Sequence, residues 1–321
     1  MTLTPNKIYN DLVSNKIEKF TAFELLISIL ENEENDKIRL DSLIYLEKIE
    51  LINNTLFKIL ENLLISDYNS EIRNFAAYFI RKKFLSRAIT PFKWAMNHET
   101  DFNCLITVIK SLEKIDSDES KTILFQKVKK IIKMKYLNKA KKIENKKHTK
   151  VLKSLIKEKK YIDFTHLELA DILINFYIIY SLINKFPNVY YRLNSHNGLI
   201  EELDLSDIME YEVRGTPWGW KNNIKTLSQI AGLNYLTNLK KLDLSNNQIE
   251  NLEGLNTLLN LTQLIISNNK ISNIKNINHL KKLPNLEYLD LRGNKIVQNI
   301  TKNNFSSKMT VLLSDSYIKI K

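Results

Sequence analysis

The chain has 321 residues, of which 44% are hydrophobic and 26% charged, and its formal net charge is +12 at pH 7. This composition excludes an intrinsically disordered protein, and the length predicts about two domains. The single cysteine, Cys104, excludes an internal disulfide framework and a cysteine-rich metal site. Because the N-terminal residues also lack the pattern of a secretory signal, we expect a cytoplasmic protein.

Residues 1–126 predict an all-α domain. All six glycines follow Asn197, and a long glycine-free chain with apolar residues at a period near 3.6 suits helices. Segments 35–49, 69–84 and 99–115 each place a polar cap before such a helix, and shorter helical segments at 23–31, 55–65 and 91–97 lie between them. Thr21 with Glu24 has the pattern of a capping box, and Thr90-Pro91 places proline in a first turn.

The three segments repeat, with Ile38, Ile72 and Phe102 at equivalent positions. Paired helices that recur with a period of roughly 30 residues predict an α-solenoid. The region resembles short HEAT-like repeats, including an Ile-Arg step at residues 38–39 and 72–73. The third unit departs from the pattern with Asn103 in place of arginine, and a generic helical bundle is the alternative architecture.

Residues 127–186 form a predicted lysine-rich connector. Between Lys127 and Lys160 there are 15 lysines and two glutamates, so the basic excess of the chain lies in this one segment. A turn is expected at 144–150, which has no apolar residue. The candidate basic patch consists of Lys129, Lys130, Lys133, Lys141, Lys142, Lys146 and Lys147.

Three interpretations of the lysine-rich connector stay open. It is a solvated helix face, a contact for nucleic acid or an acidic protein, or a contact for an anionic membrane surface. The connector contains no arginine, and Tyr136 is its only aromatic residue before Lys160, which weakens the nucleic-acid interpretation.

An apolar run at 172–183 follows, preceded by a capping-box pattern at Thr165 and Glu168. The run is about a dozen residues long, whereas a transmembrane helix requires about 20. We therefore expect a buried helix at the junction of the two halves, and no transmembrane segment.

Residues 187–321 contain three copies of one pattern: "LKKLDLSNNQI" at 239–249, "LTQLIISNNKI" at 261–271 and "LEYLDLRGNKI" at 286–296. These match L-x-x-L-x-L-x-x-N-x-L apart from Leu/Ile exchange, and the region resembles leucine-rich repeats. The resemblance implies an α/β solenoid with a short parallel sheet. Its spacing of roughly 22 residues is similar to that of phosphatase-regulating leucine-rich proteins, which implies regulation or scaffolding by protein binding.

In this pattern the leucines point into a stacked core, and Asn247, Asn269 and Asn294 turn inward to bond the backbone of neighbouring coils. A fourth, earlier unit at 200–208 has Ile208 at the asparagine position. Before it, Asn197-Gly198 predicts the turn of a hairpin that covers the sheet edge, and residues 309–321 are a candidate cap at the other end.

The outward positions of the strands form the candidate partner surface. They are Glu201, Glu202, Asp204, Ser206, Lys240, Lys241, Asp243, Ser245, Thr262, Gln263, Ile265, Ser267, Glu287, Tyr288, Asp290 and Arg292. Ile265 near Tyr288, ringed by charges, has the composition of a protein contact. The predicted contact residues are Lys241, Asp243, Ile265, Tyr288, Asp290 and Arg292. The alternative is that four strands offer too little area and only keep the repeats soluble.

An insertion at 209–225 separates the first unit from the second, because the interval from Ile200 to Leu239 is much longer than one repeat of roughly 22 residues. It contains Arg214, Trp218 and Trp220, residue types enriched at interface hot spots. Two interpretations stay open: a loop that binds a partner, or one that packs on the flank of the solenoid or on the helical half.

No nucleotide-binding, metalloprotease or serine-hydrolase motif occurs, and the five histidines share no metal-ligand spacing. We therefore expect a non-enzymatic protein with no cofactor, metal or catalytic residue. The function predicted is a protein-interaction scaffold or regulatory adaptor, and the alternative is a nucleic-acid-binding protein that uses the basic helices.

Overall fold

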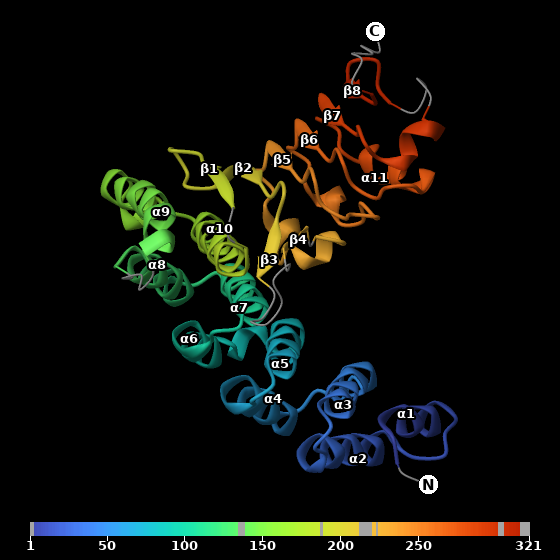
Figure 1. Cartoon of the computed structure of the whole chain (residues 1–321). Helices are drawn as coiled ribbons and strands as arrows, with labels where there is room; N and C mark the ends of the chain where they lie inside the picture. Colours follow the sequence, from blue (N-terminus) through green and yellow to red (C-terminus); the bar gives the residue numbers. More distant parts are fainter. Residues whose placement is uncertain are drawn as a thin grey trace. The chain divides into compact units, whose positions relative to one another are not determined.

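The computed structural model describes residues 3–133, 139–186, 189–211, 220–222, 224–300 and 305–314. The chain divides into two compact units, Met1–Lys127 and Val128–Lys321 (Figure 1). The first is helical, and the second combines helices with the strands of the repeats. An α-solenoid followed by an α/β repeat solenoid, as the sequence predicts, is confirmed. The second unit holds both the predicted connector, from residue 128 onward, and the predicted repeat domain.

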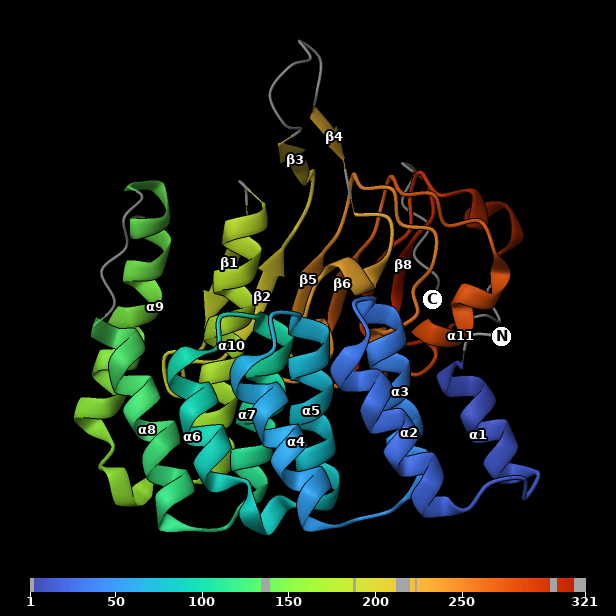
Figure 2. The same ribbon diagram turned by 90° about the horizontal axis from the view of Figure 1, so that it is seen from below.

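The first unit is a two-layered stack of helix pairs (Figure 2). Its elements are α1 (Pro5–Val13), α2 (Lys19–Asn32), α3 (Asp36–Ile49), α4 (Asn54–Ser66), α5 (Ser70–Lys83), the 3-10 turn η1 (Leu85–Arg87), α6 (Ile89–His98), α7 (Phe102–Lys114) and the start of α8 (Asp118–Lys133). Helices α2, α4 and α6 contact their partners α3, α5 and α7, and α5 contacts both α3 and α7. The pairs thus follow one another as a stack, as an α-solenoid predicts.

The second helix of each pair begins at a side-chain cap. Asn35, Asn69 and Asp101 accept hydrogen bonds from backbone N–H groups two or three residues further on, which satisfies donors that the helix leaves unpaired. The capping box expected at Thr21 is wrong: α2 begins earlier, after Glu18, and Thr21 lies inside it.

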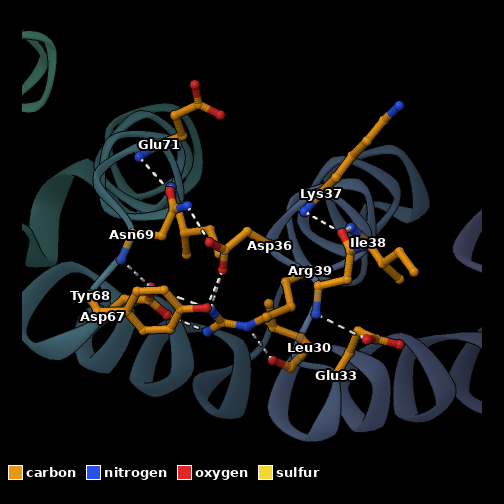
Figure 3. Close-up of polar contacts among 12 residues, drawn as sticks. Leu30, Glu33, Asp36, Lys37, Ile38, Arg39, Asp67, Tyr68, Asn69 and Glu71 are labelled. Atoms are coloured by element: carbon orange, nitrogen blue, oxygen red, sulfur yellow. Dashed lines mark hydrogen bonds and ion pairs between the residues drawn. The ribbon is translucent and has the colours of Figure 1, made fainter.

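Two arginines link successive pairs, and both are the arginines of the Ile-Arg steps. The Arg39 guanidinium on α3 donates to the Leu30 carbonyl at 3.2 Å and forms an ion pair with Asp67, the C-terminal cap of α4 (Figure 3). Arg73 on α5 donates to the Asp67 carbonyl at 2.9 Å and to both carboxylate oxygens of Glu99, the C-terminal cap of α6, at 2.7 and 2.9 Å.

Each arginine therefore binds the end of the preceding helix and an acid of the next pair. Such forked hydrogen bonds fix the stagger of neighbouring pairs. Asn103 stands at this position in the third pair, and its shorter side chain has no guanidinium with which to continue the linkage.

The second unit begins with the end of α8 and with α9 (Lys139–Glu158), η2 (Tyr161–Asp163) and α10 (His166–Lys185). The turn expected at 144–150 is wrong, because α9 passes through it unbroken. The capping box at Thr165 and Glu168 is confirmed, and α10 is buried as predicted. The Asn175 amide oxygen on α10 accepts from the Ile200 N–H at 2.9 Å, which ties this helix to the first repeat strand.

Helix α10 is longer than its apolar run of about a dozen residues suggested. At 20 residues it is, within the described part of the chain, the one helix with the length and composition of a membrane span. Of its most apolar window, 61% is buried. Burial of this kind is typical of the core helix of a folded domain.

The sheet of the repeats has six strands in the order β1 (Tyr190–Leu193), β2 (Ile200–Asp204), β5 (Lys241–Asp243), β6 (Gln263–Ile265), β7 (Tyr288–Asp290) and β8 (Thr310–Leu312). Strands β2, β5, β6, β7 and β8 are parallel, and β1 pairs antiparallel with β2, which confirms the predicted hairpin. Residues 310–312 of the predicted C-terminal cap thus form a fifth parallel strand.

The inward asparagines are confirmed. The Asn269 side-chain N–H donates to carbonyls of Leu244, Ile266 and Ser267 at 2.9–3.2 Å, and its Oδ1 accepts from Ile249 N–H at 2.9 Å. Asn247 and Asn294 donate in the same way. Asn276, 4% exposed, adds an inward amide that the pattern did not reveal, since it lies where the third coil is three residues longer.

The insertion forms a separate two-stranded antiparallel sheet of β3 (Met209–Tyr211) and β4 (Trp220–Asn222). Strand β2 pairs directly with β5, so the main sheet continues past the insertion. The coil resumes at Ile224, which is fully buried, and at η3 (Leu227–Gln229).

Candidate functional site

The solvent side of the six-stranded sheet consists of two rows of side chains that run across the strands. Side chains alternate between the two sides of the sheet along each strand. On the core side, the register aligns a row of buried residues: Leu203, Leu242, Leu264, Leu289 and Val311. The first outward row is Arg192, Glu202, Lys241, Gln263, Tyr288 and Thr310. The second is Tyr190, Asp204, Asp243, Ile265, Asp290 and Leu312. We call these two rows the strand face.

Four residues expected to be exposed here are buried: Glu201, Ser245, Ser267 and Asp290. The pattern of alternation predicts which face a residue lies on, but not what covers it. Asp290, for example, is 2% exposed because Arg292 lies against it, donating from Nη2 to Oδ2 at 2.8 Å and from Nε to Oδ1 at 3.0 Å.

The aspartates of the second row have a local structural role. Asp204, Asp243 and Asp290 each accept a hydrogen bond from the backbone N–H two residues further on, at 2.9–3.1 Å. An aspartate that bonds its own chain in this way stabilises a turn. Asp243 and Asp290, predicted from the sequence as contact residues, thus have carboxylates already engaged within the repeats.

Ile265 departs from this row. It stands between Asp243 and Asp290 in the sheet register, where it gives up the turn hydrogen bond that its neighbours make, and it is half-buried. Tyr288 and Gln263 lie beside it in the first row. An apolar side chain where the repeat favours aspartate is the kind of exception expected at a functional position.

Strand β1 widens the strand face with two residues that the sequence pattern did not single out. Tyr190 is 52% exposed, and Arg192 lies beside Glu202. The predicted hairpin could have indicated them, because antiparallel pairing sets their face. Arg192 donates to Glu202 at 2.8 Å, and this hydrogen bond lowers the pKa of the Glu202 carboxyl.

Glu201 is held at the edge of the strand face rather than exposed on it. Its carboxylate accepts from Lys240 Nζ at 2.8 Å and from Asn194 Nδ2 at 2.9 Å, and Arg192 lies 3.3 Å away. The hydrogen bond from Lys240, followed by that from Asn194, lowers the pKa of Glu201. Lys241, half-buried in the first outward row beside Glu202, also helps to lower the pKa of the Glu202 carboxyl.

Comparison with protein families gives one match that overlaps these strands: the model for leucine-rich repeats in two copies matches residues 259–306. The C-terminal part of the chain is a leucine-rich repeat region. This agrees with the stacked coils, parallel strands and inward asparagines described above. Leucine-rich repeats indicate a role in protein interaction, and the match indicates no catalytic family.

Two solved structures of internalins from Listeria monocytogenes are similar to the leucine-rich repeats. Internalin C2 is 32% identical over 29% of this chain and 36% of its own, with a TM-score of 0.22. The internalin inlF is 29% identical over 36% of this chain and 28% of its own, with a TM-score of 0.25. The chain thus spans about a third of the length of each. A comparison with curated proteins gave no significant match.

Other predicted site residues lie apart from the strand face or outside the described part of the chain. Arg214 and Trp218 are outside the described residues, as are the side chains of Trp220, Lys141, Lys142, Lys146 and Lys147. Lys129, Lys130 and Lys133 are exposed on α8. Among the described residues, no group of three His, Cys, Asp or Glu side chains is placed to hold a metal ion.

Proposed function

We propose that the protein is a non-enzymatic scaffold or regulatory adaptor that binds a protein partner on the strand face of its leucine-rich repeats. The observation that carries this proposal is Ile265, an apolar residue that stands between two turn-forming aspartates in the sheet register. A side chain that weakens the local turn and faces solvent is best explained by a contact made in a complex.

The composition of the strand face favours a partner with an apolar anchor. Ile265 and Tyr288 supply an apolar centre, while Lys241, Gln263 and Arg192 supply polar groups around it. Tyrosine and arginine are enriched in interface hot spots, and a polar rim around an apolar centre is the usual arrangement of a protein interface.

The inserted segment and the basic helices extend the same proposal. The loop with Arg214, Trp218 and Trp220 follows the first repeat strand in the chain and is proposed to contact the same partner. The lysines of α8 and α9 are proposed to meet a second, acidic protein surface in the cytoplasm. The comparisons give no support to the nucleic-acid alternative.

The proposal is tested by Ile265→Asp, which introduces the residue type found at this position in the two neighbouring strands. The new carboxylate can accept from the Ser267 N–H, so we expect the variant to fold with unchanged thermal stability. Affinity capture from the native cell extract, quantified by mass spectrometry, should show at least a tenfold loss of the partners recovered by the wild type.

Ile274→Asp is the matched control. Ile274 is 43% exposed but lies on η6 (Ile274–Asn276), away from the strands. Equal partner recovery by the wild type and a folded Ile265→Asp variant would contradict the proposal. So would an equal loss in the control, because that would show a general response to added charge.

A further inference from the structure

A groove of about 390 Å³ lies between α2 and the start of α4, the first helices of two successive pairs. It is lined by Phe20, Phe23, Glu24, Ile27, Ser28 and Glu31 of α2, and by Asn53 and Thr55 at the start of α4. Phe20, Glu24, Ile27 and Glu31 recur at helical spacing, so they share one face of α2. None of these residues belongs to the leucine-rich repeats.

The groove combines an aromatic surface with unpaired negative charge. Phe20 is 56% exposed and stacks on Phe23 with 6.3 Å between ring centroids. Glu24 and Glu31 are exposed, no basic side chain lines the groove, and neither carboxylate forms an ion pair with any described residue. An aromatic face flanked by carboxylates attracts a cation.

The next helix pair shows what fills the equivalent place. The acids that end α2 and α4, Glu33 and Asp67, occupy equivalent places in the two pairs. With these two acids aligned, Phe57 corresponds to Phe23 and Arg87 to Asn53.

In the second pair an arginine of the chain itself lies at the equivalent place. The Arg87 guanidinium lies over the Phe57 ring, 3.8 Å from its centroid, and donates to Asn54 Oδ1 at 2.8 Å. Lys58 stands where the first pair has Glu24, and Ile65 where it has Glu31. The pair that contains its own arginine therefore lacks the two acids, and the pair with two acids lacks the arginine.

We propose that the first-pair groove binds an arginine side chain presented by a basic segment of a partner protein. The guanidinium stacks on the exposed Phe20 ring beside Glu24, which lies one turn further along α2, and Glu31 adds negative charge at the other end of the groove. Arginine suits this site better than lysine, since its flat guanidinium stacks on a ring while donating in its plane to carboxylates. The acids oppose binding of polyanions, including nucleic acid and anionic membranes.

The experiment uses the full-length protein labelled at isoleucine δ1 methyl groups and observed by NMR. Ile27 lines the groove, and its signal is assigned with the Ile27→Val variant. The probe is a capped octapeptide with the sequence of residues 83–90, "KFLSRAIT", whose arginine is the one that lies at the equivalent place in the second pair. The matched probe has citrulline in place of arginine, which keeps the shape but removes the charge.

We expect saturable shifts of the Ile27 methyl signal with the arginine peptide and about tenfold weaker binding of the citrulline peptide. Glu24→Gln/Glu31→Gln and Phe20→Ala should each weaken binding of the arginine peptide about tenfold. Glu34→Gln, an exposed acid outside the groove, should leave it unchanged. Near-native spectra of the variants away from the groove establish that they fold.

The proposal is overturned if the arginine peptide causes no saturable shift at Ile27. It is also overturned if citrulline binds as well as arginine, or if the double glutamine variant binds as tightly as the wild type. Because the groove shares no residue with the strand face, none of these outcomes depends on the Ile265 experiment.

Discussion

The residue before each inward asparagine position adopts a left-handed backbone conformation. Asp207, Asn246, Asn268 and Gly293 have φ between 51° and 71°, once in each successive coil. Aspartate and asparagine tolerate this region better than other side chains, and glycine adopts it freely. Asn268 donates to Asn246 Oδ1 at 2.8 Å, so the side chains at this position also link neighbouring coils.

At the last of these positions an added side chain would meet the preceding coil. A Cβ atom on Gly293 would lie 2.1 Å from Asn268 Oδ1 and 3.1 Å from Asn268 Cα. Gly293→Ala should therefore lower the free energy of unfolding by about 3 kcal/mol, from backbone strain and overpacking together. Urea denaturation followed by circular dichroism measures this.

Gly254→Ala is the control for that substitution. Gly254 has φ of 101°, yet nothing lies within 4 Å of the added Cβ, so only backbone strain of about 1 kcal/mol is expected. If the two variants lose equal stability, the contact with Asn268 has no role.

At the scale of the element, the arginines that link helix pairs act on nearly buried acids. The Glu99 side chain is 3% exposed. Burial raises the pKa of its carboxyl, but hydrogen bonds from Arg73 and from backbone N–H groups outweigh this, and the pKa is below its ordinary value. Glu99 thus adds stability above its unfolded pKa, and this stability is lost as the pH falls through the native pKa.

Arg73→Met should lower the free energy of unfolding by about 3 kcal/mol at pH 7, because it leaves the Glu99 carboxylate buried without its cation. The difference from the wild type should shrink as the pH falls, because Glu99 buried without its cation takes up a proton at a higher pH in the variant than in the wild type. Adding Glu99→Gln should recover part of the loss in a double-mutant cycle. Strictly additive effects in urea denaturation would show that the two residues are not coupled.

The elements themselves follow closely from the sequence, because period, caps and the repeat pattern are local signals. Ile265, Tyr288 and the inward asparagines could be assigned to their faces in this way. What could not be predicted depends on neighbours from other coils or helices. The burial of Asp290 under Arg292, the target of Arg39 and the pairing of Phe57 with Arg87 each require knowing which distant residue lies opposite.

At the scale of the whole molecule, each unit contains a buried titratable side chain whose pKa is shifted by burial. In the first, burial raises the pKa of the Cys104 thiol, so it is neutral and unreactive in the native state. In the second, His148 on α9 is fully buried against the rings of Phe176 and Tyr191, and neither ring nitrogen has a hydrogen-bond partner among the residues that the structure describes. Burial lowers the pKa of His148 to about 3.

Acid should destabilise the second unit through His148. Since the native pKa lies below the ordinary value of 6.5, the stability from neutral His148 is complete above pH 6.5 and declines as the pH falls from there toward 3. Between pH 7 and pH 5 we expect a loss of about 2 kcal/mol in the unfolding of this unit. Urea denaturation with a fluorescent label in the repeats measures it.

His148→Phe should remove most of this pH dependence, whereas His196→Gln, at an exposed site, should not. Labelling of Cys104 by a thiol reagent under the same conditions reports unfolding of the first unit. After correction for the pH dependence of the reagent itself, the labelling rate should remain slow at pH 5. A pH slope that persists in His148→Phe would assign the effect to other groups.

The arginine links between helix pairs also give the array a direction. Every junction described joins an arginine of the earlier pair to an acid that ends the first helix of the later pair, so units cannot be exchanged freely. A duplicated copy of the second pair would join its neighbours on both sides, since it carries both halves of the junction. The third pair, with Glu99 but Asn103, accepts a neighbour on one side only. Gene duplication could thus lengthen this solenoid from within, but any unit added beyond the third pair would need a different joint.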